Sequence, residues 1–331
     1  MDSSLISRRH FSALTAAAAL AAPLSALPQA AFPQPGRPIR LLVGLAAGGS
    51  LDGQARSVAR RLAELTGGQV VVENKPGASM MLSASEVMRA NPDGYTLLYA
   101  PSSLFAQNPH TLPSVPYDPF KDFTPITLAA RGPLVLTVHT SLPVQTAKDL
   151  VMWAKANPGK LNFASFGTGT SSHIYALAFA RTAGIEVTHV PYKGTAEAAR
   201  DLLEGRVQAY FDAAPTAISN TATGRIRMVG VASPKRMPAA PDVPTFNEQG
   251  IPGIDLTSWI SIVGPAKMPP DVVARLNALL VQTLNSPDVR EFYAKGAWEA
   301  SPSTPAELTS EMRIAYDKWG AMVKAIGFEK Q

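Results

Sequence analysis

From residue 39 onward, short apolar runs alternate with longer stretches in which apolar residues recur every three or four positions. The longer stretches predict helices at 52–65, 82–90, 146–156, 171–183 and 196–203, and two longer amphipathic helices at 269–285 and 305–326. The short runs predict strands at 39–45, 70–73, 95–100, 134–138, 161–165, 187–190, 209–212 and 228–231. Strands separated by helices in this way indicate βαβ units. The sequence therefore predicts an α/β fold of mostly parallel sheets flanked by helices.

Two proline-rich segments without a period, 101–125 and 233–253, interrupt the alternation. One precedes and the other follows a central α/β block, so the first domain is expected to be discontinuous and completed by the C-terminal helices. We expect lobe 1 at 32–130 and 253–331, and lobe 2 at 131–252. This is the layout of a two-lobed binding protein, whose ligand cleft lies between the lobes at the carboxyl ends of the strands.

The first 31 residues have the layout of an export signal, with Arg8-Arg9 ahead of an Ala/Leu-rich run. That run is too short and too rich in alanine for a stable membrane span. The order Ser-Arg-Arg-His-Phe at 7–11 resembles the twin-arginine motif, although Ser12 stands where that motif usually has Leu. An ordinary Sec signal that happens to contain two arginines is the alternative. By either route the protein is expected in the periplasm.

Composition excludes several classes of function. The chain has 331 residues, 46% of them hydrophobic, and its net charge of +5 is spread out rather than gathered in a basic tract, so nucleic acid is not an expected partner. The absence of cysteine excludes disulfides, thiol catalysis and Cys-ligated metal. The five histidines lie far apart and none is followed by Glu, so no metal site and no cofactor are predicted.

Gly48-Gly49-Ser50 stand between a predicted strand and a predicted helix. Their spacing fits neither a Walker loop, which needs a Lys, nor the G-x-G-x-x-G dinucleotide fingerprint. Glycines let a backbone approach a ligand closely, and the first N–H groups of a helix attract an anion. A plain tight turn and a ligand loop both remain open for this stretch.

A second glycine-rich loop follows the strand that ends at Ser165. It carries more hydroxyls than a helix cap needs, which favours ligand binding, and the two loops could face each other across one cleft. Its candidate ligand-binding residues are Ser165, Thr168, Gly169, Thr170, Ser171 and His173. Asp212 ends another strand, where it could bind a ligand ammonium or a water, or cap the next helix.

An enzymatic alternative is a secreted serine hydrolase with Ser171 as nucleophile, His173 as base and Asp212 to orient it. None of the three G-x-S triplets continues to the closing glycine of G-x-S-x-G, because Asp52, Met81 or His173 stands there. The two-residue spacing of Ser171 and His173 at a helix start also makes the geometry poor. We therefore expect a protein without catalytic residues.

Several longer stretches are specific in combination. They are Arg37-Pro38-Ile39-Arg40, Gly48-Gly49 with Asp52, VVVENKPGA (70–78), NPDGYTLLYA (91–100), VPYDPFKDFTPI (115–126), PGKLNFASFGTGTSSH (158–173), HVPYKG (189–194), GRVQAYFD (205–212) and SPKRMPAAPDVPTF (233–246). In this order and spacing, the chain from about Pro35 to its end resembles the Bug family of periplasmic solute-binding receptors, also called TctC-like, which serve tripartite tricarboxylate transporters.

The resemblance implies two α/β lobes of the type II, Venus-flytrap kind that close on a small organic carboxylate. It implies that the loop at Gly48-Gly49-Ser50 holds carboxylate groups, that the loop from Ser165 to His173 binds the opposite end, and that Ser102 and Ser103 match cleft positions. It also implies delivery of the ligand to the transporter's membrane subunits. Presentation to a sensor kinase is an alternative role for such a receptor.

The chain departs from the family pattern at three places. Ala46-Ala47 stand where the family often has prolines, Ser79-Met80-Met81 occupy a turn that is usually glycine-rich, and Phe166 replaces a small residue. These bulkier and more apolar residues favour a monocarboxylate with an apolar or aromatic part.

Overall fold

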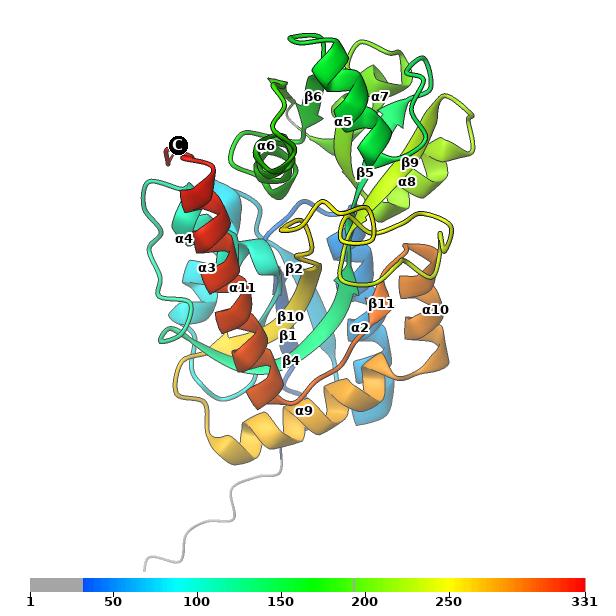
Figure 1. Cartoon of the computed structure of the whole chain (residues 1–331). Helices are drawn as coiled ribbons and strands as arrows, with labels where there is room; N and C mark the ends of the chain where they lie inside the picture. The colour runs from blue at the N-terminus through cyan, green and yellow to red at the C-terminus, as the bar shows by residue number, and fades with distance from the viewer. Residues whose placement is uncertain (1–31, 193, 331) are drawn as a thin grey trace, which may run out of the picture. The chain divides into compact units, whose positions relative to one another are not determined.

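The computed structural model describes residues 32–192 and 194–330 (Figure 1). The predicted export signal at 1–31 lies outside the described residues. No helix among those described combines the length and apolar character that a membrane span requires.

The first sheet has the strand order β11-β4-β10-β3-β1-β2. Its strands are β1 (Ile39–Val43), β2 (Val70–Asn74), β3 (Thr96–Pro101), β4 (Phe123–Gly132), β10 (Ser258–Pro265) and β11 (Glu299–Ala300). The helical segments of this part are α2 (Ser50–Thr66), η1 (Ala78–Met80), α3 (Met81–Met88), η2 (Ser103–Gln107), α4 (Asn108–Thr111), α9 (Pro270–Leu284), α10 (Pro287–Lys295) and α11 (Pro305–Ala325).

The second sheet, drawn mostly in green in Figure 1, has the order β7-β6-β8-β5-β9. Its strands are β5 (Leu134–His139), β6 (Asn162–Ser165), β7 (Thr188–Pro191), β8 (Ala209–Ala213) and β9 (Ile226–Ala232). The helices of this segment are α5 (Ala147–Ala156), α6 (Ser171–Ala183), α7 (Thr195–Leu203) and α8 (Ala214–Thr221). The prediction of an α/β fold with helices flanking two sheets is confirmed.

In each sheet four strands run in one direction, and one strand that arrives from the other sheet is inserted antiparallel to them; in the first sheet the short edge strand β11 also runs antiparallel, beside β4. In the first sheet the inserted strand is β10, between β3 and β4; in the second it is β5, between β8 and β9. The prediction of mostly parallel sheets therefore holds for strand direction, but the inserted strands were not foreseen. They run backwards because each enters its sheet at the edge where the parallel strands end.

The predicted strands and helices are all present, with ends that agree to within two residues. The pattern missed α10 and the two-residue β11, and it missed β4 and β10, whose residues are mostly buried and therefore show no alternation of apolar and polar positions. The expectation that 101–125 is irregular was wrong in part, because η2 and α4 lie there and β4 begins at Phe123. One turn of π-helix and one of α-helix are too short to produce a helical period.

Local signals fix several helix ends. Thr146 and Asp149 form a capping box at the start of α5. Helices α2 and α6 end on Gly67 and Gly184, both in the left-handed conformation that glycine adopts without strain.

One hydrophobic cluster includes buried residues of both sheets, and it contains Tyr175 of α6 stacked on Trp319 of α11.

Candidate functional site

Topology brings the carboxyl ends of the parallel strands in both sheets to one junction. β4 ends at Gly132 and β5 begins at Leu134, so a single residue joins the two sheets here. Leu134 is paired with Ala213, the last residue of β8. Because β6 is parallel to β8, and β1 and β3 run parallel to β4, the loops after β1, β3, β6 and β8 all emerge at this edge of their sheets.

The loop after β1 holds three of the predicted residues, Gly48, Gly49 and Ser50, and all three are exposed. Gly48 has a φ of 84° and Gly49 is the N-cap of α2, with no side chain capping the helix. A Cβ added at Gly49 would meet only the Ala46 carbonyl oxygen, at 3.7 Å. The main chain is therefore open to approach at the start of α2.

Asp52 fixes this loop through hydrogen bonds to its carboxylate. Its carboxylate accepts the Gly48 N–H at 2.9 Å and the Arg56 Nε–H at 3.0 Å. The hydrogen bond from Arg56, followed by that from Gly48, keeps the pKa of Asp52 below its ordinary value despite burial. Arg56 also donates to Asn74, which in turn donates to the Leu45 carbonyl oxygen at 3.0 Å. The loop is thus fixed on both sides by side-chain contacts.

The segment after β3 carries Ser102 and Ser103, the two residues that the resemblance assigned to the cleft. Ser102 is 6% exposed and its Oγ lies 3.4 Å from the Trp259 main-chain nitrogen. Ser103 is half-buried, and its hydroxyl makes no hydrogen bond with another described residue. A turn later, the Gln107 side chain donates through Nε2 to the Gly169 carbonyl oxygen at 2.6 Å.

In the loop after β6, two predicted hydroxyls are used within the loop itself. Ser165 is fully buried, and its Oγ lies 2.7 Å from His189 Nε2 and accepts the Gly167 N–H at 3.2 Å. The Thr170 hydroxyl donates to the Gly167 carbonyl oxygen at 2.6 Å, so this residue is the N-cap of α6 without capping it by its side chain. Thr168 and Ser171 differ from these, since neither hydroxyl bonds to another described residue.

His173 lies in the first turn of α6, where its Nδ1 accepts the Gly169 N–H at 3.1 Å. Its ring is stacked on His189, with 3.5 Å between centroids and 8° between planes. Burial first, and the nearby His189 second, lower the pKa of His173 to about 4. The imidazole is therefore neutral at neutral pH, with a lone pair on Nδ1.

Asp212 is fully buried at the end of β8. Its Oδ1 accepts the Ala213 N–H at 2.8 Å, while Oδ2 has no hydrogen-bond partner among the described residues. Burial raises the pKa of Asp212 to about 7; the Tyr210 hydroxyl opposes that shift, although no hydrogen bond of ordinary geometry joins the two groups. The carboxyl is thus poised between its protonated and ionised forms near neutral pH.

The hydrolase alternative requires a hydrogen-bonded relay through Ser171, His173 and Asp212. The His173 Nδ1 atom is occupied by the Gly169 N–H instead, and the Asp212 Oδ1 by Ala213. No hydrogen bond within the described residues links the three side chains in series. The arrangement lacks the nucleophile–base–carboxylate geometry of such enzymes.

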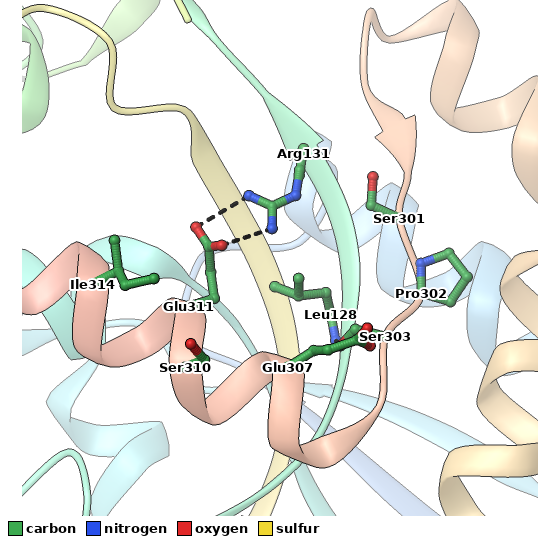
Figure 2. A pocket seen from close by; sticks show the side chains of 9 residues that line it. All are labelled: Leu128, Arg131, Ser301, Pro302, Ser303, Glu307, Ser310, Glu311 and Ile314. Carbon is green, nitrogen blue, oxygen red and sulfur yellow. Dashed lines mark hydrogen bonds and ion pairs between the residues drawn. The ribbon is translucent and has the colours of Figure 1, made fainter. Parts of the chain in front are cut away.

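A hollow of about 410 Å³ lies elsewhere, between α11, β4 and the segment 301–303 (Figure 2). Arg131 of β4 and Glu311 of α11 face each other there in a two-bond ion pair, at 2.8 and 3.1 Å. None of the predicted ligand-binding residues lines it. The lining residues are Leu128, Arg131, Ser301, Pro302, Ser303, Glu307, Ser310, Glu311 and Ile314.

Sequence reasoning missed three residues that hold the second loop, namely Gln107, His189 and Phe328. Phe328 packs its ring edge-on to His173, with centroids 5.6 Å apart. His189 had a weak signal, since it lies in the stretch HVPYKG, which matches the family, and in a predicted strand. Gln107 and Phe328 had none, because their roles depend on contacts far away in the chain.

The comparisons with known proteins agree on one family. Residues 54–328 match the model of the TctC family, described as "Tripartite tricarboxylate transporter family receptor". A curated relative from Pseudomonas sp. (strain P51), the "UPF0065 protein in tcbD-tcbE intergenic region", is 35% identical over 290 residues, which cover 87% of this chain and 86% of the relative.

Two solved structures are similar over nearly their whole length. One is "R. palustris Rpa4515 with adipate", with 32% identity, a TM-score of 0.80, and coverage of 90% of this chain and 99% of the other. The second is "periplasmic binding protein BugD", with 32% identity, a TM-score of 0.76, and coverage of 90% and 100%. On this evidence the chain belongs to the Bug or TctC family, the receptors of tripartite tricarboxylate transporters.

Proposed function

We propose that this protein is a periplasmic receptor that captures a small organic carboxylate without turning it over, and delivers it to the membrane subunits of a tripartite tricarboxylate transporter. The proposal rests on one observation above all. Two helix N-termini, of α2 and α6, follow glycine loops at the shared junction of the sheets, and neither is capped by a side chain. Such N-termini attract anions through their first N–H groups.

The contacts around the loops support their use as two ends of one site. Gln107, which follows the strand next to β1, donates to Gly169 of the second loop, and this bond links the two sides of the junction. The hydroxyls of Ser103, Thr168 and Ser171 remain available as donors to a ligand. Hydrogen bonds to a charged group contribute roughly 1.5–3 kcal/mol each, so a few of them suffice to hold a small carboxylate.

We propose that the lobes are 32–130 with 253–331, and 131–252, and that they close on the ligand. The sheets divide along the same lines, since strands β5–β9 come from 134–232 and the remaining strands from both sides of that segment. In this proposal Gly48, Gly49 and Ser50 hold one end of the ligand and Thr168 to Ser171 the other. A ligand that touches both loops favours the closed state through its higher affinity for that state.

We also propose export by the twin-arginine route, with Arg8 and Arg9 as the recognised pair. The similarity to a periplasmic binding protein supports export. The similarity to a protein solved with adipate supports a carboxylate ligand. In this proposal the bulkier and more apolar residues at Ser79-Met80-Met81 and Phe166 favour a monocarboxylate with an apolar or aromatic part.

A thermal-shift screen followed by calorimetry tests the ligand class. Adipate, shorter and longer dicarboxylates, and aromatic and aliphatic monocarboxylates are each compared with the matching amide. Binding to the folded state raises its stability by RT ln(1 + [L]/Kd), so an acid at a hundredfold excess over Kd adds about 2.7 kcal/mol. Amides that stabilise as well as the acids would contradict anion binding.

The variant Gly49→Val tests the first loop. It places a branched side chain where the ligand must approach the main chain, but the open space there leaves the fold undisturbed. Gly68→Val is the matched control, because Gly68 lies just before the first residue of β2, at the edge of the sheet opposite to the one where the loop after β1 emerges. We expect binding to fall at least tenfold in Gly49→Val and to stay unchanged in Gly68→Val. Equal binding by both variants would remove the first loop from the site.

A further inference from the structure

Two histidines, His173 of α6 and His189 of β7, are stacked face to face behind the second glycine loop. Their centroids are 3.5 Å apart and their planes differ by 8°. His173 is 6% exposed and His189 is partly buried. The ring of Phe328 lies edge-on to His173, with centroids 5.6 Å apart, and a Cβ added at Gly169 of the loop would meet that ring at 3.6 Å.

Each ring fixes one part of the loop. His173 Nδ1 accepts the N–H of Gly169, and His189 Nε2 lies 2.7 Å from the Ser165 hydroxyl, which itself accepts the N–H of Gly167. Gly167 and Gly169 have φ values of 144° and 73°, which glycine adopts as readily as negative values, so the backbone itself does not select this shape and hydrogen bonds must fix it. The two imidazoles therefore fix the main chain in front of α6 together with Gln107 and Thr170, which bind the Gly169 and Gly167 carbonyl oxygens.

We infer that His173 and His189 are positioning residues, which keep the second loop in its ligand-binding shape only while both rings are neutral. The inference rests on the proposed function, because it assigns a role to the loop that we propose holds one end of the ligand. Its consequence is that acidification of the surroundings releases the loop and lowers the affinity for the ligand.

The chemistry of the pair explains the dependence. Protonation of His173 at Nδ1 converts the acceptor of the Gly169 N–H into a second donor, so the hydrogen bond is lost and two N–H groups face each other. If both rings were protonated, two positive charges would lie in a buried site on rings whose centroids are 3.5 Å apart, and they would repel each other. Burial lowers the pKa of both histidines, and His189 further lowers that of His173, to about 4.

No other described ionisable group contributes to these shifts. The neighbouring elements carry charged groups of their own: α6 has Arg181 in its last turn, β8 has Asp212, and the C-terminal segment has Lys330, which donates to the Pro109 carbonyl oxygen. None of them alters the pKa of either histidine. Lys193 follows β7 in the sequence and lies outside the described residues.

The sign of the effect follows from linkage. The folded-state pKa of His173, about 4, lies below its ordinary value of 6.5. Between these values the unfolded chain binds more protons than the folded one, so folding is progressively less favoured as the pH falls from 6.5 toward 4. The pair's contribution is complete above pH 6.5, and it is lost as His173 becomes protonated.

Three variants separate the acceptor from the charge. His173→Asn keeps an acceptor oxygen near the position of Nδ1 but cannot titrate, and His173→Leu removes the acceptor. His189→Gln keeps a polar group near Nε2 and removes the neighbouring charge that lowers the pKa of His173. The first readout is ligand-free: the amide signal of Gly169 and the ring signals of His173, followed by NMR from pH 7.5 to 4. The second is calorimetry with adipate over the same range.

In the wild type we expect the NMR signal of the Gly169 amide to shift as the His173 ring becomes protonated. In His173→Asn this signal should not shift in that way, and in His189→Gln it should shift at a higher pH than in the wild type. At pH 7.5, His173→Leu should bind adipate about tenfold more weakly, the loss of one hydrogen bond to the loop, whereas His173→Asn should bind within threefold of the wild type. Protonation of adipate at low pH weakens binding equally in all variants. Only the difference between variants in how their adipate affinity falls with pH therefore reports on the histidine pair.

A Gly169 amide that does not respond while the His173 ring protonates would overturn the inference. The inference would also be overturned if the adipate affinity of His173→Asn fell with decreasing pH in the same way as that of the wild type. If adipate binds no variant at any pH but the Gly169 amide titrates as expected, the pair still positions the loop, and the failure belongs to the proposed ligand class.

Discussion

The side-chain amide of Gln107 donates to the main-chain carbonyl of Gly169 at 2.6 Å, which joins the segment after β3 to the loop after β6. The amide oxygen differs, since Gln107 Oε1 is buried and makes no hydrogen bond within the part of the chain that the structure describes. A buried acceptor left unpaired costs free energy, so the bond made by Nε2 must offset that cost. The Gln107–Gly169 hydrogen bond therefore joins the two sides of the proposed site.

Replacing Gln107 should weaken this link. We expect Gln107→Ala to lower the free energy of unfolding by about 1–3 kcal/mol, because it leaves the Gly169 carbonyl oxygen without its donor. Urea denaturation measures the effect. Gln145→Ala is the matched control, because the exposed Gln145 side chain makes no hydrogen bond to a described residue and its loss should change stability by less than about 0.5 kcal/mol. Equal effects at both positions would show that the link contributes nothing.

The two neighbouring hydroxyls of the second loop should behave differently. Ser171→Ala removes a hydroxyl with no described partner, so we expect weaker ligand binding with an unchanged melting temperature. Thr170→Ala removes the donor to the Gly167 carbonyl oxygen, so it should also cost about 1 kcal/mol of stability. Calorimetry and thermal unfolding of both variants check this. A Ser171→Ala variant with full affinity would reduce that residue to part of the helix start.

Asp212 should make stability depend on pH in the direction opposite to most carboxylates. Its pKa is raised to about 7 by burial, so the folded state favours the protonated form; this contribution is complete below the ordinary value of 3.8 and is lost as the pH rises through about 7. Asp212→Asn keeps the acceptor for the Ala213 N–H and cannot ionise.

We therefore expect the stability of Asp212→Asn, relative to the wild type, to improve by roughly 1–3 kcal/mol between pH 5 and pH 8.5. Urea denaturation at both pH values measures it. A stability difference between the two proteins that is the same at pH 5 and pH 8.5 would mean that Asp212 is ionised throughout that range.

Export by the twin-arginine route should depend on Arg8 and Arg9 together. Changing both to Lys preserves the charge but removes the recognised pair, so we expect the precursor to accumulate in the cytoplasm. Cell fractionation and immunoblotting check the outcome, with His10→Lys as a control that alters a neighbouring residue of the segment. Normal export of the double Lys variant would assign the protein to the Sec route.

The sequence by itself determined the local elements and the family. The predicted strand at 39–45 and the predicted helices at 52–65 and 146–156 follow from the apolar period, which acts within a few residues, and each is present with ends that differ by at most two residues. The glycine loops were recognisable because glycine and hydroxyl residues before a helix have a direct physical meaning there. The matching motifs indicated the family that the comparisons then confirmed.

Only the tertiary structure decided which residues of these loops are available. Ser165 and Thr170 look like Thr168 and Ser171 in the sequence. The hydroxyls of Ser165 and Thr170 are hydrogen-bonded within the protein, whereas those of Thr168 and Ser171 make no hydrogen bond to a described residue. The difference arises from partners such as His189, which becomes a neighbour of Ser165 only when β7 pairs with β6. A period or a cap carries no information about such contacts, because they depend on how distant segments are brought together by the packing of the sheets.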